Sequence, residues 1–111
     1  MILGSLALFA LAALLGALLL SFVLRDKPTP KGLLFLHGGI AATGLLLLIF
    51  YTFGASPKPY ESLVLFLLAA SGGAFMGVRD LLGKKVPKWL AIGHGLLALS
   101  GFGFLLFHAF Y

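Results

Sequence analysis

The sequence lacks cysteine and contains few charged residues. Without cysteine, the chain cannot use thiol catalysis, iron–sulfur clusters, disulfides or cysteine-type zinc sites. Charged residues make up 10% of the 111 residues and hydrophobic residues 61%. A soluble domain carries about 25% charged and roughly 45–50% apolar residues. This composition excludes a soluble monomer and a disordered tail, and it is typical of an integral membrane protein.

Four apolar runs are long enough to cross a bilayer, whose hydrocarbon core takes about 20 helical residues. The runs cover residues 2–24, 33–53, 60–82 and 89–111. Hydrocarbon offers no partner for an unpaired backbone group, so we expect each run to be a helix. The first run lacks a basic leader and exceeds the apolar core of a signal peptide, so we expect it to be retained. The sequence predicts an all-α, antiparallel four-helix membrane bundle.

The basic residues are unevenly distributed between the connections. Seven of the eight Lys and Arg residues lie in or beside connections 25–32 and 83–88, and only Lys58 lies in the other connection. The positive-inside rule therefore predicts that both connections are cytoplasmic and both termini outside. The expected partner of this charge is the lipid bilayer, since no folded basic domain remains for nucleic acid.

The chain contains an internal repeat. Shifting it by 57 residues aligns residues 1–54 with residues 58–111 without a gap, and 21 of the 54 aligned positions are identical. The matches include Pro30/Pro87, Lys31/Lys88, His37/His94 and Gly44/Gly101. We expect two tandem helical hairpins that together form one domain. Each hairpin crosses the membrane twice, so a pseudo-two-fold axis along the membrane normal is expected to relate them.

The repeat pairs two intramembrane histidines, His37 and His94, at the same expected depth. Each lies six residues after a lysine, or about 9 Å along a helix. Two such imidazoles suit the axial positions of one b-type haem. Alanine and glycine follow on the same helix stripe and predict a shallow groove for the ring. The predicted groove residues are Ala41, Gly44, Ala98 and Gly101, and the predicted basic residues on the propionate side are Arg25, Lys31, Arg79 and Lys88.

Other interpretations of the histidine pair stay open. Each histidine can simply make a hydrogen bond between helices, and the duplication alone can explain their match. A non-haem metal, quinone or proton role is a further alternative, although structural zinc normally needs four ligands. His108 lies on nearly the same face as His94, and its repeat counterpart is Tyr51. These two residues predict either a second ligand or quinone site, or aromatic anchors at the membrane surface.

The pattern P-K-x-L-x-x-x-H-G-x-x-A-x-x-G occurs twice, from Pro30 and from Pro87. In this respect the chain resembles small, uncharacterised bacterial membrane proteins with four helices, and this resemblance implies a place in a bacterial inner membrane. Its histidine arrangement is similar to the four-helix core of membrane b-type cytochromes, including the cytochrome b561 group. Those cytochromes commonly carry two haems, whereas this chain lacks the fourth histidine. The resemblance implies one haem b on His37 and His94, and electron transfer with a quinone or a protein partner.

Two further functions remain beside haem binding. The first alternative is a non-enzymatic membrane scaffold or accessory subunit, because faces such as Ala69, Gly73 and Gly77 favour close helix packing and allow a homodimer. The second is a small transporter. The chain is similar in length to the small multidrug resistance transporters but lacks their intramembrane acidic residue. A conventional enzyme is not expected, because the three acidic residues, Asp26, Glu61 and Asp80, lie at membrane edges and form no carboxylate pair.

Overall fold

The computed structural model describes residues 1–111 and contains four helices and no strand. The helices are α1 (Ile2–Leu24), α2 (Lys31–Gly54), α3 (Tyr60–Leu81) and α4 (Lys88–Phe110). All four are long and apolar enough to cross a membrane. These bounds lie within two residues of the predicted runs, so the prediction of an all-α four-helix bundle is confirmed.

Prolines mark the start of three helices. Pro30, Pro59 and Pro87 immediately precede α2, α3 and α4. A proline fits at a helix start because the missing N–H would find no partner within the helix there. The apolar runs therefore become helices that begin where the prolines allow.

The ends of α1 and α3 have the same backbone motif. The N–H groups of Asp26 and Lys27 donate to the carbonyls of Val23 and Phe22, and those of Gly83 and Lys84 donate to the carbonyls of Asp80 and Arg79. Asp26 and Gly83 have φ angles of 55° and 75°, as this helix-ending motif requires. They occupy equivalent positions in the repeat, so both hairpins turn in the same way at this end.

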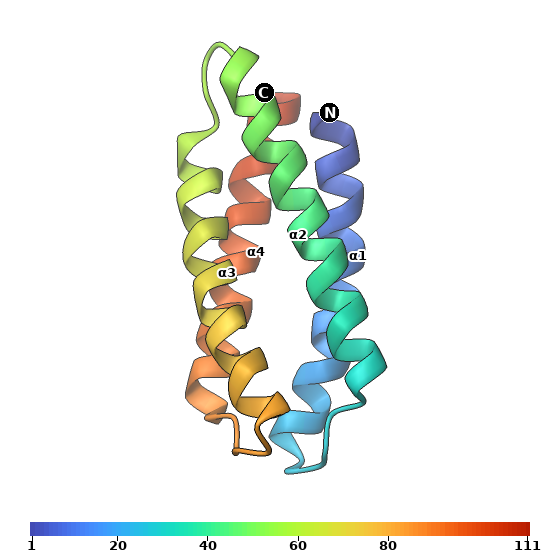
Figure 1. Ribbon diagram of the computed structural model, residues 1–111. Helices are drawn as coiled ribbons and strands as arrows, with labels where there is room; N and C mark the ends of the chain where they lie inside the picture. The colour runs from blue at the N-terminus through green and yellow to red at the C-terminus, as the bar shows by residue number, and fades with distance from the viewer.

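The four helices stand side by side in an elongated bundle (Figure 1). Helix α1 packs against α2 and α4, and α3 packs against α4 and α2, so α1/α3 and α2/α4 are the diagonal pairs. Both termini and the α2–α3 connection lie at one end, and the α1–α2 and α3–α4 connections lie at the other (Figure 1). We call the latter the charged end.

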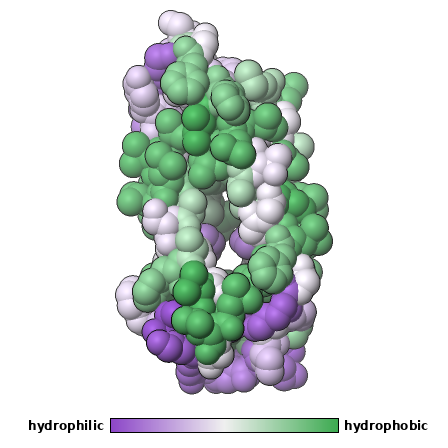
Figure 2. Space-filling model, in the orientation of Figure 1, coloured by the Kyte–Doolittle hydropathy of each residue, from purple (hydrophilic) through white to green (hydrophobic).

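Five buried apolar side chains form a cluster toward the terminal end. They are Leu6, Phe9, Leu48, Phe66 and Leu105. The rings of Phe9 and Phe66 stack across the α1/α3 diagonal, with 3.8 Å between centroids and 7° between planes. Most other apolar side chains point outward and form a hydrophobic belt above the hydrophilic charged end (Figure 2). The core therefore closes the bundle on the terminal side of the two histidines.

Candidate functional site: a histidine pair between diagonal helices

His37 on α2 and His94 on α4 meet across the interior of the bundle. Their ring centroids are 6.3 Å apart and their planes are inclined by 82°. Both rings are partly buried and line one cavity. The two imidazoles that the repeat paired in sequence are thus neighbours in space.

The neighbouring helix fixes each imidazole. Nδ1 of His37 lies 2.8 Å from the carbonyl oxygen of Ala12, and Nδ1 of His94 lies 2.7 Å from that of Ala69. A carbonyl oxygen only accepts hydrogen bonds, so each Nδ1 carries the proton and donates it. In the neutral form of each ring the lone pair then lies on Nε2, and neither Nε2 has a hydrogen-bond partner in the protein. This is the tautomer and orientation of a histidine that binds a metal through Nε2.

Two glycines make room for these rings. A Cβ atom on Gly16 would lie 2.9 Å from Cε1 of His37, and one on Gly73 would lie 2.9 Å from Cε1 of His94. Each glycine follows its accepting alanine by one helical turn. An alanine in its place would therefore push the imidazole away from the carbonyl that orients it.

The cavity beside the histidines, here called the histidine cavity, encloses about 100 Å³. Its lining includes Gly16, Gly73 and Gly77, together with apolar residues such as Met76 and Leu19. Figure 2 shows that one face of the molecule is hollowed below its middle, with hydrophilic atoms visible in the opening. A space of this volume accommodates several water molecules.

The residues predicted from sequence to form the groove do not line the histidine cavity. A Cβ on Gly44 would lie 3.3 Å from Leu8 and Phe9, and one on Gly101 would lie 3.3 Å from Leu65 and Phe66. These two buried glycines therefore let α1 approach α2, and α3 approach α4. Ala41 and Ala98 are partly buried and do not line the histidine cavity.

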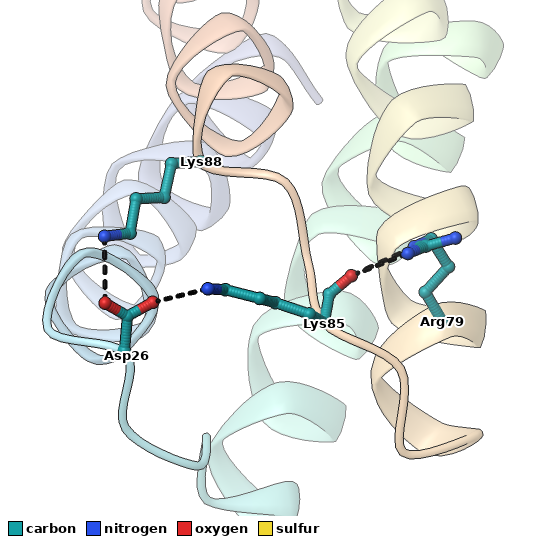
Figure 3. Close-up of polar contacts among 4 residues, drawn as sticks. All are labelled: Asp26, Arg79, Lys85 and Lys88. Atoms are coloured by element: carbon teal, nitrogen blue, oxygen red, sulfur yellow. Dashed lines mark hydrogen bonds and ion pairs between the residues drawn. The ribbon is translucent and has the colours of Figure 1, made fainter.

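Ion pairs between the two hairpins occupy the charged end. Nζ of Lys31 lies 3.0 Å from the carboxylate of Asp80, and Nζ of Lys88 lies 3.0 Å from that of Asp26. Lys85 also pairs with Asp26, at 3.2 Å (Figure 3). Hydrogen bonds from Lys88 and Lys85 hold the pKa of the Asp26 carboxyl below its ordinary value.

The four basic residues predicted on the propionate side all have partners within the protein. Lys31 and Lys88 belong to the ion pairs. Arg79 donates to the carbonyl of Lys85 (Figure 3), and Arg25 donates to the carbonyl of Ser21. These residues lie at the same end of the bundle as the histidine cavity, but among them only Lys31 and Lys88 carry ion pairs.

Tyr51 and His108 form a separate pair toward the terminal end. The phenolic oxygen of Tyr51 lies 3.2 Å from Nε2 of His108, and their rings meet nearly at right angles. This bond joins α2 to α4 across the same diagonal as the histidine pair. The structure thus brings together both residues of the predicted second site and gives each the other as its partner.

Sequence reasoning missed three parts of the site: the roles of Gly16 and Gly73, the anchoring carbonyls of Ala12 and Ala69, and the Asp80 ion pair with Lys31. A signal existed for the first two, because Ala12/Ala69 and Gly16/Gly73 are identical pairs of the repeat. Nothing in the sequence showed which helix face meets which histidine. No third His, Asp or Glu joins the pair to form a metal-ligating group.

Comparisons with known proteins found no relative of this chain. The chain matches no protein-family model, no curated protein and no solved structure. The geometry of the histidine pair is therefore the basis for a functional proposal.

Proposed function

We propose that this chain is an integral membrane protein that binds one haem b between His37 and His94 and transfers electrons to or from a quinone or a protein partner. The observation that carries the proposal is the distance of 6.3 Å between the two ring centroids. A bond from imidazole nitrogen to metal is about 2 Å long, and a ring nitrogen lies about 1 Å from the ring centre. Two imidazoles on opposite sides of one metal ion therefore have centroids about 6 Å apart.

The nitrogen donors of the two histidines fit a haem. Nδ1 of each histidine is bound to a backbone carbonyl, which leaves Nε2 as the nitrogen available to iron. Haem held by His37 and His94 would supply one-electron transfer. A porphyrin is larger than the histidine cavity of about 100 Å³, so binding requires side chains around the opening to move.

The proposal includes a membrane placement. The seven basic residues of the charged end favour a cytoplasmic position for the α1–α2 and α3–α4 connections and an outside position for both termini. The contacts of His37 with Ala12 and of His94 with Ala69 are equivalent in the repeat, which supports a pseudo-two-fold axis between residues 1–54 and residues 58–111.

The absorption spectrum tests haem binding. We expect protein purified in detergent, after expression with ample haem, to be red, with a Soret band that sharpens on reduction with dithionite. His37→Ala and His94→Ala should each abolish the band, and His108→Ala, the matched control outside the cavity, should retain it. Far-UV circular dichroism should show equal helix content in all variants. A colourless parent protein, or a full band in His37→Ala, would contradict the proposal.

A second candidate function, a membrane scaffold or accessory subunit, is favoured by a different observation. A Cβ on Gly38, Gly39, Gly93 or Gly95 would meet nothing within 4 Å, so these glycines leave open surface on α2 and α4. Helices associate closely in membranes through such small residues. Colourless protein that purifies with a partner, and loses that partner in Gly38→Leu, would support the scaffold function.

A further inference from the structure

A second cavity, here called the loop cavity, adjoins the histidine cavity at the charged end. It encloses about 440 Å³ between the α1–α2 and α3–α4 connections, and most of its lining is polar or charged. The residues that line both cavities are Val23, Thr29, Asp80 and Val86, which we call the entrance ring. The two cavities therefore meet at this ring of four side chains.

The entrance ring consists of two pairs of repeat-equivalent positions, 23/80 and 29/86. In each pair one residue is valine and the other is polar. The two polar residues bind each other, since the hydroxyl of Thr29 donates to the carboxylate of Asp80. Lys31 lies 3.0 Å from the same carboxylate oxygen and 3.2 Å from the hydroxyl of Thr29. The polar half of the ring is thus closed by a three-residue contact that the other half lacks.

No comparable polar route leads to the histidines from the terminal end of the bundle. The stacked rings of Phe9 and Phe66 are only 6% and 5% exposed, and Leu48 and Leu105 are completely buried. Phe9 lies one helical turn beyond Ala12, the partner of His37, on the side away from the charged end. A hydrated solute would lose its hydrogen bonds in this apolar layer. In the proposed membrane placement the opening in the side of the bundle faces lipid, so the entrance ring is the polar route to the histidine cavity.

We propose that the loop cavity and the histidine cavity form one entry passage, through which water and small hydrophilic solutes reach His37 and His94 from the charged end alone. The side chain of Asp80 is the barrier in this passage, because it is only 16% exposed and is held by Thr29 and Lys31 at the ring. Breaking its ion pair opens the passage. The proposal rests on the membrane placement and does not depend on haem.

The absence of cysteine makes the passage directly testable, since an introduced cysteine is the only thiol in the chain. Gly77 lines the histidine cavity, and a Cβ there would meet nothing within 4 Å, so Gly77→Cys places a thiol in the passage without a clash. Lys84→Cys marks the charged end and Lys58→Cys marks the terminal end. The measurement is labelling by a small, membrane-impermeant thiol reagent added outside lipid vesicles that hold colourless, haem-free protein.

We expect Gly77→Cys to be labelled in molecules whose charged end faces the reagent, that is, in the same fraction of molecules as Lys84→Cys. In molecules whose terminal end faces the reagent, where Lys58→Cys is labelled, Gly77→Cys should stay unlabelled. Adding Asp80→Asn should raise the labelling rate of Gly77→Cys about threefold or more, because the lysine then loses its ionic partner. Asp26→Asn is the matched control, since Asp26 also pairs with lysines but lines only the loop cavity. It should leave the rate within about twofold.

Labelling of Gly77→Cys from the Lys58 side would overturn the proposal, and so would equal rates in Asp80→Asn and Asp26→Asn. If Asp80→Asn fails to fold, Thr29→Val replaces it. That variant removes only the hydroxyl donor and introduces the residue already present at the equivalent position, Val86. The absorption spectrum of haem-supplied protein is measured separately, so failure of the passage and failure of haem binding remain distinguishable.

Discussion

Each imidazole ring of the histidine pair lies against a glycine of the neighbouring helix. The distance from Cε1 to the position of the missing Cβ is 2.9 Å at both Gly16 and Gly73. Gly77 lies one turn further along α3 and faces open space. Two glycines on the same helix thus differ completely in what a methyl group would meet.

This difference gives a prediction for two alanine variants. Gly73→Ala should push His94 from the carbonyl of Ala69 and lower the free energy of unfolding by about 1–3 kcal/mol, as overpacking does. Gly77→Ala should raise it by up to about 1 kcal/mol, because alanine favours the helix. Denaturant titration in detergent, followed by circular dichroism, measures both. Equal effects of the two substitutions would show that Gly73 does not touch the histidine as described.

At the scale of single residues, the sequence predicted part of the histidine site. The repeat and the shared depth predicted that His37 and His94 would face each other, and the structure places their ring centroids 6.3 Å apart. The groove was expected on the histidines' own helices, at Gly44 and Gly101, whereas the glycines that touch the rings lie on α1 and α3. A stripe on one helix is visible in sequence, but the rotation of its neighbour depends on packing.

At the scale of helices and connections, Asp26 joins the two hairpins. It ends α1 with a φ of 55° and pairs with Lys85 and Lys88 from the other hairpin. The length and position of the helices were predictable from hydropathy and proline. These ion pairs were not, because they join residues about 60 positions apart through flexible side chains.

The pairing of Asp26 predicts a dependence of stability on pH. Lys88 and Lys85 lower the pKa of this carboxyl in the folded protein. Its contribution is therefore complete above the ordinary pKa of about 4 and is lost as the pH falls through the lower folded value. Asp26→Asn removes the charge and keeps a residue that tolerates the same φ.

Thermal unfolding in detergent tests this expectation. The parent protein should melt at a higher temperature than Asp26→Asn at pH 7, and the two melting temperatures should converge as the pH falls below about 4. High salt should reduce the difference at pH 7, because the ion pairs are exposed. A difference that grows on acidification would contradict the assigned sign.

At the scale of the whole molecule, the rings of Phe9 and Phe66 connect α1 with α3 across a diagonal on which the backbones do not touch. The two residues are equivalent in the repeat and belong to different hairpins. Their contact therefore contributes to the stability of one hairpin against the other. The sequence identified the pair as identical but could not show that the two rings stack.

A double-mutant cycle measures this contact. Phe9→Leu and Phe66→Leu should each destabilise the protein, and the double variant should lose about 0.5–1.5 kcal/mol less than the sum of the two. Phe9→Leu combined with Phe50→Leu, an exposed position on α2, serves as the additive control. Additivity in the Phe9/Phe66 cycle would mean that the stacked rings do not stabilise each other.

The entrance ring shows what is gained when two similar hairpins share one polypeptide. In a homodimer of a single hairpin, every substitution at this constriction would appear twice, so one carboxylate would bring a second carboxylate into the same ring. Joined in tandem, the halves can diverge: one contributes Thr29 and Val23, the other Asp80 and Val86. The donor and the acceptor then meet only once, with a single negative charge, and this end of the bundle is asymmetric in a way that no assembly of identical halves can be.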